Sequence, residues 1–167
     1  YRDVLFAMPT HAPTIAALES LFAANQHQSE VIAILEPLYE AGGEFEKLHA
    51  VYQAQLAAQV APRERLAMLQ RLAELAELRL ADPGRAFQWW SQALIEDPSS
   101  ELASEQLERF ARDLGAWDHL AASYQQALED HATLDRTVVR DVLIKRGRVL
   151  EEELGDVAGA VEAYLRV

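Results

Sequence analysis

Apolar residues recur at intervals of three and four along nearly the whole chain, which is the spacing that lines one face of an α-helix. One such run contains Phe45, Leu48, Val51, Tyr52 and Leu56. No segment alternates apolar with polar residues over the length of a strand, and no Asn-Gly or Asp-Gly pair offers a hairpin turn. These patterns predict an all-α fold.

Glycine, proline and aspartate residues divide the chain into stretches of helical length. Asp82 and Asp156 stand where a side-chain oxygen can accept from the free N–H groups of the next helix. Gly115 and Gly155 suit the left-handed residue that ends a helix. Pro37 lies inside one stretch, and we expect it to kink or split that helix. The predicted helical segments are residues 1–7, 12–24, 28–41, 44–60, 64–80, 83–96, 100–113, 116–131, 136–154 and 157–167.

The helical pattern repeats at long range, which is the signature of a repeat architecture. One set reappears 72 residues later: Gly43, Phe45, Leu48, Tyr52 and Leu56 match Gly115, Trp117, Leu120, Tyr124 and Leu128. A second set reappears 74 residues later: Leu69, Ala73, Leu80, Asp82, Ala86, Phe87 and Trp90 match Leu143, Gly147, Leu154, Asp156, Ala160, Val161 and Tyr164. Helical hairpins repeated in this way bury their apolar faces against neighbouring hairpins, so the pattern predicts an α-solenoid.

Small and large apolar residues alternate in a characteristic way in the central part of the chain. The run is Leu72-Ala73, Leu75-Ala76, Ala86-Phe87, Trp90, Ala93-Leu94 and Pro98. It resembles the tetratricopeptide repeat, in particular the long, irregular arrays of high-GC bacteria such as myxobacteria. The resemblance implies antiparallel hairpins in a right-handed superhelix, with a partner peptide or helix in its concave groove. We expect residues 1–167 to form one such segment of a longer repeat protein.

The charge balance argues against several classes of partner. Lys and Arg number 15 against 27 Asp and Glu, which gives a formal net charge of −12. A nucleic acid is therefore an unexpected partner, because phosphate binding needs a concentrated basic face. The chain has no cysteine and no apolar run approaching the roughly 20 residues that span a bilayer. We expect a cytoplasmic protein that does not insert into membranes.

One basic stripe is the candidate contact surface for a partner. It consists of Arg136, Arg140, Lys145 and Arg148, on a segment that the resemblance places along the groove. An acidic peptide would suit it, although Asp141 stands one turn from Lys145 and can pair with it locally. Trp89 is a second candidate, since a helix turns about 100° per residue and Trp89 cannot share the core position of Trp90.

The sequence offers little support for catalysis. Glu46 and His49 form a Glu-x-x-His pair of the kind that supplies half of a di-iron site in a helical bundle, but no second such pair occurs. We expect both residues, like the other histidines, to lie on solvated surface. The predicted function is a noncatalytic protein-interaction scaffold without cofactor or metal. The alternatives are a structural spacer or a module that self-associates through its open ends and, more remotely, a helical-bundle metalloenzyme.

Overall fold

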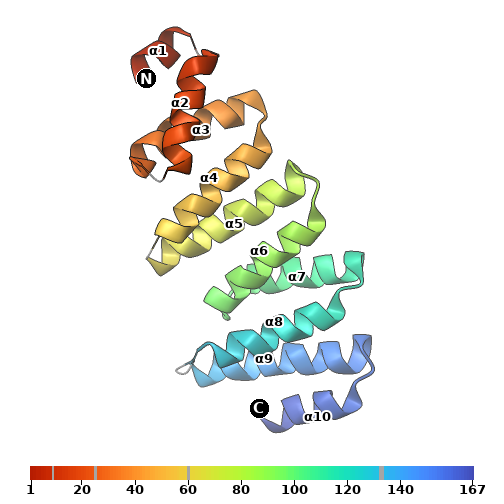
Figure 1. Cartoon of the computed structure of the whole chain (residues 1–167). Coiled ribbons are helices and arrows are strands. Elements are labelled where there is room, and N and C mark those ends of the chain that lie inside the picture. Colours follow the sequence, from red (N-terminus) through yellow and green to blue (C-terminus); the bar gives the residue numbers. More distant parts are fainter. Residues whose placement is uncertain (9, 25, 60, 132–133) are drawn as a thin grey trace. The chain divides into compact units, whose positions relative to one another are not determined.

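The structure is a computed structural model that describes residues 1–8, 10–24, 26–59, 61–131 and 134–167 (Figure 1). All regular structure in these ranges is helical, so the all-α prediction is confirmed. The α-helices are α1 (Arg2–Ala7), α2 (Ala12–Ala23), α3 (Gln28–Gly42), α4 (Phe45–Ala58), α5 (Pro62–Leu78), α6 (Pro83–Glu96), α7 (Glu101–Leu114), α8 (Trp117–Glu129), α9 (Arg136–Arg148) and α10 (Val157–Leu165). A short π-helix, η1 (Val149–Glu153), directly follows α9.

Most predicted helix ends fall within two residues of the observed ones, and the predicted ending residues have the expected geometry. Asp82 accepts a hydrogen bond from the backbone N–H of Arg85 at 2.9 Å, and Asp156 accepts one from Gly159 at 3.0 Å. Gly115 and Gly155 both have left-handed backbone, with φ of 67° and 65°. These oxygens and glycines satisfy backbone groups that the helix itself leaves without partners.

Two helices bear on the detail of the sequence prediction. Pro37 lies within α3, and the helix continues through it to Gly42, so the expected split is wrong, whereas the alternative of a kink stays a prediction. The segment predicted as one helix over residues 136–154 is α-helical only to Arg148 and then widens into η1. In η1 the N–H of Leu154 donates to the carbonyl of Val149 at 3.2 Å, five residues back.

The chain forms two compact units, residues Tyr1–Ala58 and Gln59–Val167. In the first unit α2 packs against α3 and α3 packs against α4. Leu18, Leu35 and Val51, one from each of these helices, are almost completely buried between them. The expectation of one segment over residues 1–167 stays a prediction.

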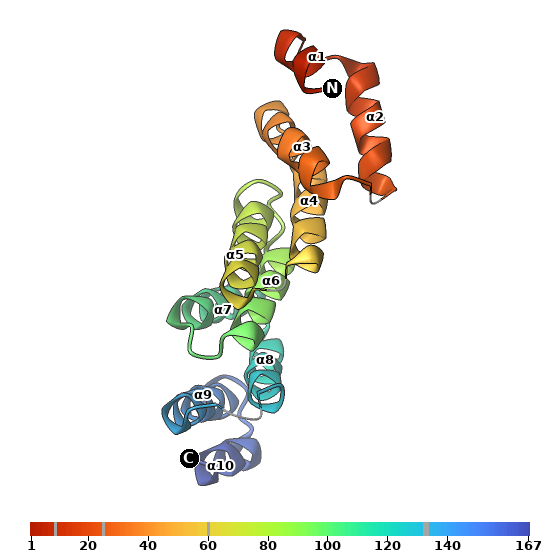
Figure 2. The same cartoon turned by 90° about the vertical axis from the view of Figure 1, so that its left-hand side faces the viewer.

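The second unit contains three helical hairpins, α5 with α6, α7 with α8 and α9 with α10. Figure 2 shows α5, α7 and α9 along one side of this unit, with α6 and α8 along the other. We call α5, α7 and α9 the first-helix layer and α6, α8 and α10 the second-helix layer.

Side chains connect neighbouring helices within each layer. In the first-helix layer, Arg109 of α7 pairs with Glu77 of α5 at 2.9 Å. In the second-helix layer, the hydroxyls of Ser91 on α6 and Ser123 on α8 are hydrogen bonded. The ring of His119 on α8 lies edge-on to Phe87 on α6, with centroids 6.5 Å apart. Side chains of α5 therefore contact α7, and side chains of α6 contact α8.

Small residues lie at the helix contacts of the second unit, as the sequence predicted. Ala73, Ala76, Ala86 and Ala93 are all completely buried, and Trp90 beside them is 3% exposed. Small side chains allow two helices to approach closely while a large neighbour fills the space around them. These small residues and Trp90 thus form part of the core of the second unit.

Candidate functional site

The predicted basic stripe lies on α9, but its four residues do not share one face. Arg136, Arg140 and Arg148 are exposed, and Lys145 is partly buried. With about 100° of rotation per residue, the three arginines occupy roughly a third of the circumference of α9. Lys145 lies on the side opposite Arg136. The structure therefore places Arg136 and Arg140 close together on α9, whereas Lys145 lies nearer to Arg148, with which it lines a cleft.

Two of the four cations are paired with carboxylates. Arg140 contacts its neighbour Asp141, with Nη2 and Oδ1 3.2 Å apart. The Nζ of Lys145 lies 2.8 Å from Oε2 of Glu101, which belongs to α7. The prediction that Asp141 pairs locally with Lys145 is therefore wrong. Lys145 instead forms an ion pair with Glu101 of the neighbouring hairpin, and Asp141 pairs with Arg140. This ion pair also extends the contacts of the first-helix layer from α7 to α9.

Lys145 and Arg148 contribute to a small cleft of about 170 Å³. Charges of both signs line it, so it is not a basic pocket. Its lining residues are Glu108, Arg112, Trp117, Lys145, Arg148, Val149, Glu152 and Glu153. Carboxylates facing the cations weaken the field that an acidic peptide would meet here. The part of the stripe that an acidic partner could use is its three exposed arginines, Arg136, Arg140 and Arg148.

Trp89 lies on α6, in the second-helix layer. It is partly exposed, whereas its neighbour Trp90 is buried in the core, as the rotation of the helix requires. Trp89 and the α9 residues belong to different layers of the second unit, so they do not form one site.

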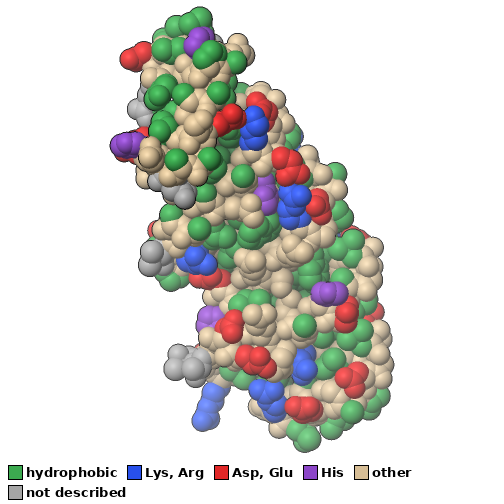
Figure 3. Space-filling model, in the orientation of Figure 1, with side chains coloured by type: hydrophobic (Ala, Val, Ile, Leu, Met, Phe, Trp, Pro, Cys, Tyr) green, Lys and Arg blue, Asp and Glu red, His purple; other side chains and the backbone are tan. Residues whose placement is uncertain are grey.

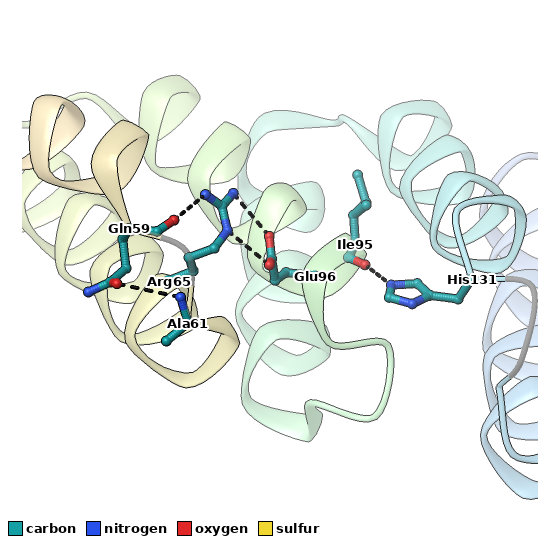
Figure 4. Close-up of polar contacts among 6 residues, drawn as sticks. All are labelled: Gln59, Ala61, Arg65, Ile95, Glu96 and His131. Carbon is teal, nitrogen blue, oxygen red and sulfur yellow. Dashed lines mark hydrogen bonds and ion pairs between the residues drawn. The ribbon is translucent and has the colours of Figure 1, made fainter.

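A cluster of polar contacts fixes the C-terminal end of α6 (Figure 4). Arg65 at the start of α5 donates to both carboxylate oxygens of Glu96, at 3.0 and 3.2 Å, and to the carbonyl of Gln59 at 3.2 Å. From the other side, Nε2 of His131 donates to the carbonyl of Ile95 at 2.6 Å. Because these contacts join backbone and paired charges at a helix end, we assign the cluster a structural role.

The two residues of the Glu-x-x-His pair on α4 differ in burial. Glu46 is exposed, but His49 is only 5% exposed, so the expectation that both lie on solvated surface is wrong for His49. The ring packs on the side of α4 that also buries Leu48 and Tyr52. In the part of the chain that the structure describes, no group of three or more His, Asp or Glu side chains is placed to hold a metal ion.

A larger cleft, of about 610 Å³, lies in the first unit. Residues of α2, of the C-terminal end of α3 and of the start of α4 line it. These residues were not predicted from the sequence to form a site. The sequence pattern that could have indicated this cleft is the series Ala12, Ile15, Ala16 and Glu19. It places small, apolar and acidic side chains on one face of a helix.

No described helix combines the length and the apolar character needed to span a bilayer. Comparison of the chain with protein-family models gave no match, and comparison with curated protein sequences gave none either.

Proposed function

We propose that this chain is a tetratricopeptide-like α-solenoid segment that acts as a noncatalytic scaffold. In this proposal a partner protein supplies a peptide or a helix, which binds along the first-helix layer of the second unit. The resemblance of the sequence to tetratricopeptide repeats implies that this layer lines the concave side. Binding affinity would come from a few anchoring side chains rather than from the whole contact area.

The observation that carries the proposal is a pattern of side-chain contacts in the second unit. First helices of neighbouring hairpins contact each other, and so do the second helices α6 and α8. Glu77 with Arg109 and Glu101 with Lys145 connect α5 to α7 and α7 to α9. Ser91 with Ser123 connects α6 to α8. Stacked hairpins with this pattern of nearest-neighbour contacts are the defining feature of helical solenoids.

The spacing of the hairpins supports the same assignment. Corresponding helices of successive hairpins begin 34 to 40 residues apart, near the roughly 34-residue period of tetratricopeptide repeats. Gly147 and Tyr164, which stand 74 residues after Ala73 and Trp90, are in direct contact across the last hairpin. The small-against-large pairing expected from the repeat is therefore present there.

Within the first-helix layer, Arg136, Arg140 and Arg148 are the side chains best placed to contact a partner. All three are exposed on α9. Arginine is favoured at interfaces because its planar guanidinium can bind a carboxylate through two parallel hydrogen bonds. This surface would suit a peptide with acidic residues.

The test is selection of short peptides from a displayed random library against the purified chain, followed by titration of the enriched peptides. The variant Arg140→Glu, Arg148→Glu should weaken binding of acidic peptides about tenfold or more. The matched control Gln88→Glu, Gln92→Glu, Arg166→Glu makes the same change in net charge at exposed residues of α6 and the end of α10, which belong to the second-helix layer, and should leave binding unchanged. Failure to enrich any peptide from the library would count against a scaffold.

A second candidate function is self-association. Val157, Val161 and Leu165 of α10 are 65%, 50% and 83% exposed, which is a large apolar surface for one short helix. Light scattering distinguishes this candidate, because a molar mass that rises with concentration, together with no enriched peptide, would favour self-association over partner binding.

A further inference from the structure

The cleft of the first unit has the size and the lining of a binding site. Its volume of about 610 Å³ lies within the range of roughly 300 to 1,000 Å³ that ligand pockets occupy. One wall is the face of α2 that carries Ala12, Ile15 and Ala16, and the opposite wall includes Leu38 and Ala41 of α3. Alanines at the exposed positions leave space that larger side chains would fill. Figure 3 shows hydrophobic side chains gathered over this part of the first unit.

One end of the cleft is polar. The ammonium group of Lys47 lies 2.8 Å from a carboxylate oxygen of Glu19 and 2.6 Å from one of Glu44. The Tyr39 hydroxyl also donates to Glu19, at 3.1 Å, and Lys47 lies over the Tyr39 ring at 5.4 Å from its centroid. The hydrogen bond from Lys47 lowers the pKa of Glu19, so this carboxylate is ionised at neutral pH. The polar end thus holds two carboxylates and one ammonium.

The rest of the first unit adds to the negative charge. Residues 1–58 contain seven Asp and Glu but only two Lys and Arg, which are Arg2 and Lys47. Glu40 and Glu46, both exposed, stand close in sequence to the acidic residues of the cleft. Because Lys47 is shared between two carboxylates, it does not present a free positive charge to a ligand. The field at the mouth of the cleft therefore favours cations and opposes anions.

We infer that this cleft binds a short amphipathic segment of a partner protein, with apolar side chains between α2 and α3 and a Lys or Arg at the acidic end. The inference rests on the proposed scaffold function but places a second contact surface on a different unit. Helical spacing on the α2 wall matches the helix-in-groove mode, in which apolar residues one turn apart fill neighbouring positions. An acidic peptide would meet Glu19 and Glu44 and is disfavoured.

The cleft of the first unit and the arginine surface of α9 should prefer peptides of opposite charge. The exposed arginines of α9 favour acidic peptides, whereas the cleft favours apolar peptides with a basic residue. One library of displayed peptides can therefore report on both surfaces in a single selection against the whole chain.

Two cleft variants test the inference. Ala16→Phe fills the cleft with a ring, and Glu19→Gln removes one carboxylate charge while keeping an acceptor for Tyr39 and Lys47. The matched controls are Ala33→Phe and Glu30→Gln, which make the same changes at exposed residues of α3 outside the cleft. Circular dichroism of each variant establishes that it is folded before binding is measured.

We expect enriched peptides with apolar residues three or four apart and a flanking Lys or Arg. Their affinity should fall about tenfold or more in Ala16→Phe, fall severalfold in Glu19→Gln, and stay unchanged in both controls. Enrichment of such peptides with equal affinity for Ala16→Phe and the wild-type chain would overturn the inference. So would enrichment restricted to acidic peptides that respond only to the α9 variant, a result that leaves the proposed scaffold function standing. If no peptide is enriched, both proposals fail.

Discussion

The ring of Tyr164 on α10 lies directly against the backbone of Gly147 on α9. A β-carbon added at residue 147 would approach three atoms of that ring to less than 3.0 Å. The Tyr164 hydroxyl donates to Glu151 at 3.1 Å, which holds the ring in this position. The absence of a side chain at residue 147 is therefore a requirement of the packing between α9 and α10.

Gly147→Ala should consequently destabilise the protein, although alanine is the better helix former. Overpacking costs about 1 to 3 kcal/mol, against a gain of about 1 kcal/mol in helix propensity, so we expect a net loss of about 1 kcal/mol in the free energy of unfolding. Urea denaturation followed by circular dichroism measures the free energy of unfolding of the variant and the wild type.

The same substitution in a second background identifies the cause of that loss. With Tyr164→Ala already present, Gly147→Ala should be neutral or stabilising, because the three nearest atoms that the β-carbon would meet all belong to the Tyr164 ring. Gly84→Ala is a further control, since the nearest atom to its β-carbon would be Oδ1 of Asp82 at 3.6 Å. A Gly147→Ala protein as stable as the wild type would show that the ring moves aside without cost.

Gly115, which ends α7, is constrained by its backbone rather than by its neighbours. Its φ is 67°, and nothing lies within 4 Å of an added β-carbon. Gly115→Ala should cost about 1 kcal/mol of unfolding free energy, because the left-handed conformation is unfavourable for residues with a β-carbon. Gly115→Asn should cost less, since asparagine tolerates this conformation better. Equal losses for Ala and Asn in urea denaturation would point to a cause other than backbone strain.

Much of the fold was predictable because its determinants are local. Helical periodicity identified the apolar faces, and Asp82, Asp156, Gly115 and Gly155 marked helix ends through interactions with backbone groups a few residues away. The long-range repeat aligned Gly147 with Ala73, which is completely buried, and Tyr164 with Trp90, which is 3% exposed; Gly147 and Tyr164 themselves are in contact. Such features can be derived from sequence because each depends on residues at fixed spacing.

The candidate site was less predictable because it depends on where long side chains reach. Asp141 stands one turn from Lys145, yet Lys145 pairs with Glu101, 44 residues earlier in the chain. His49 is buried although its sequence context suggested exposure. The cleft beside Ala16 and Glu19 arises from the packing of three helices, which no local pattern specifies.

The ion pair of Arg65 with Glu96 should contribute more to stability than the exposed pair of Arg140 with Asp141. The side chains of the first pair are 31% and 27% exposed, and those of the second are 52% and 55% exposed. A double-mutant cycle with Arg65→Met and Glu96→Gln should give a coupling of about 0.5 to 1 kcal/mol, because Arg65 uses two parallel hydrogen bonds. The corresponding cycle with Arg140→Met and Asp141→Asn should give a coupling near zero. A larger coupling in the exposed pair would contradict the structural role assigned to the end of α6.

Tyr124 should make the protein sensitive to alkaline pH. It is completely buried on α8, and its hydroxyl donates to Oε1 of Glu108 at 3.4 Å. Burial, and then the charge of Glu108, raise the pKa of Tyr124 well above its ordinary value of 10.0. The unfolded chain therefore releases this proton at lower pH than the folded chain does. The resulting stability is fully present below pH 10 and is lost as the pH rises from there toward the pKa of the folded state.

Tyr124→Phe removes this linkage and should reduce the loss of stability between about pH 8 and pH 10.5. At the lower pH the variant should be slightly less stable than the wild type, by about 0.5 to 1 kcal/mol, because one weak hydrogen bond is lost. Urea midpoints at the two pH values, with Tyr1→Phe as the control for removal of an exposed hydroxyl, provide the measurement. If the midpoints of Tyr124→Phe and the wild type fall by the same amount, alkaline unfolding is governed by groups other than this buried phenol.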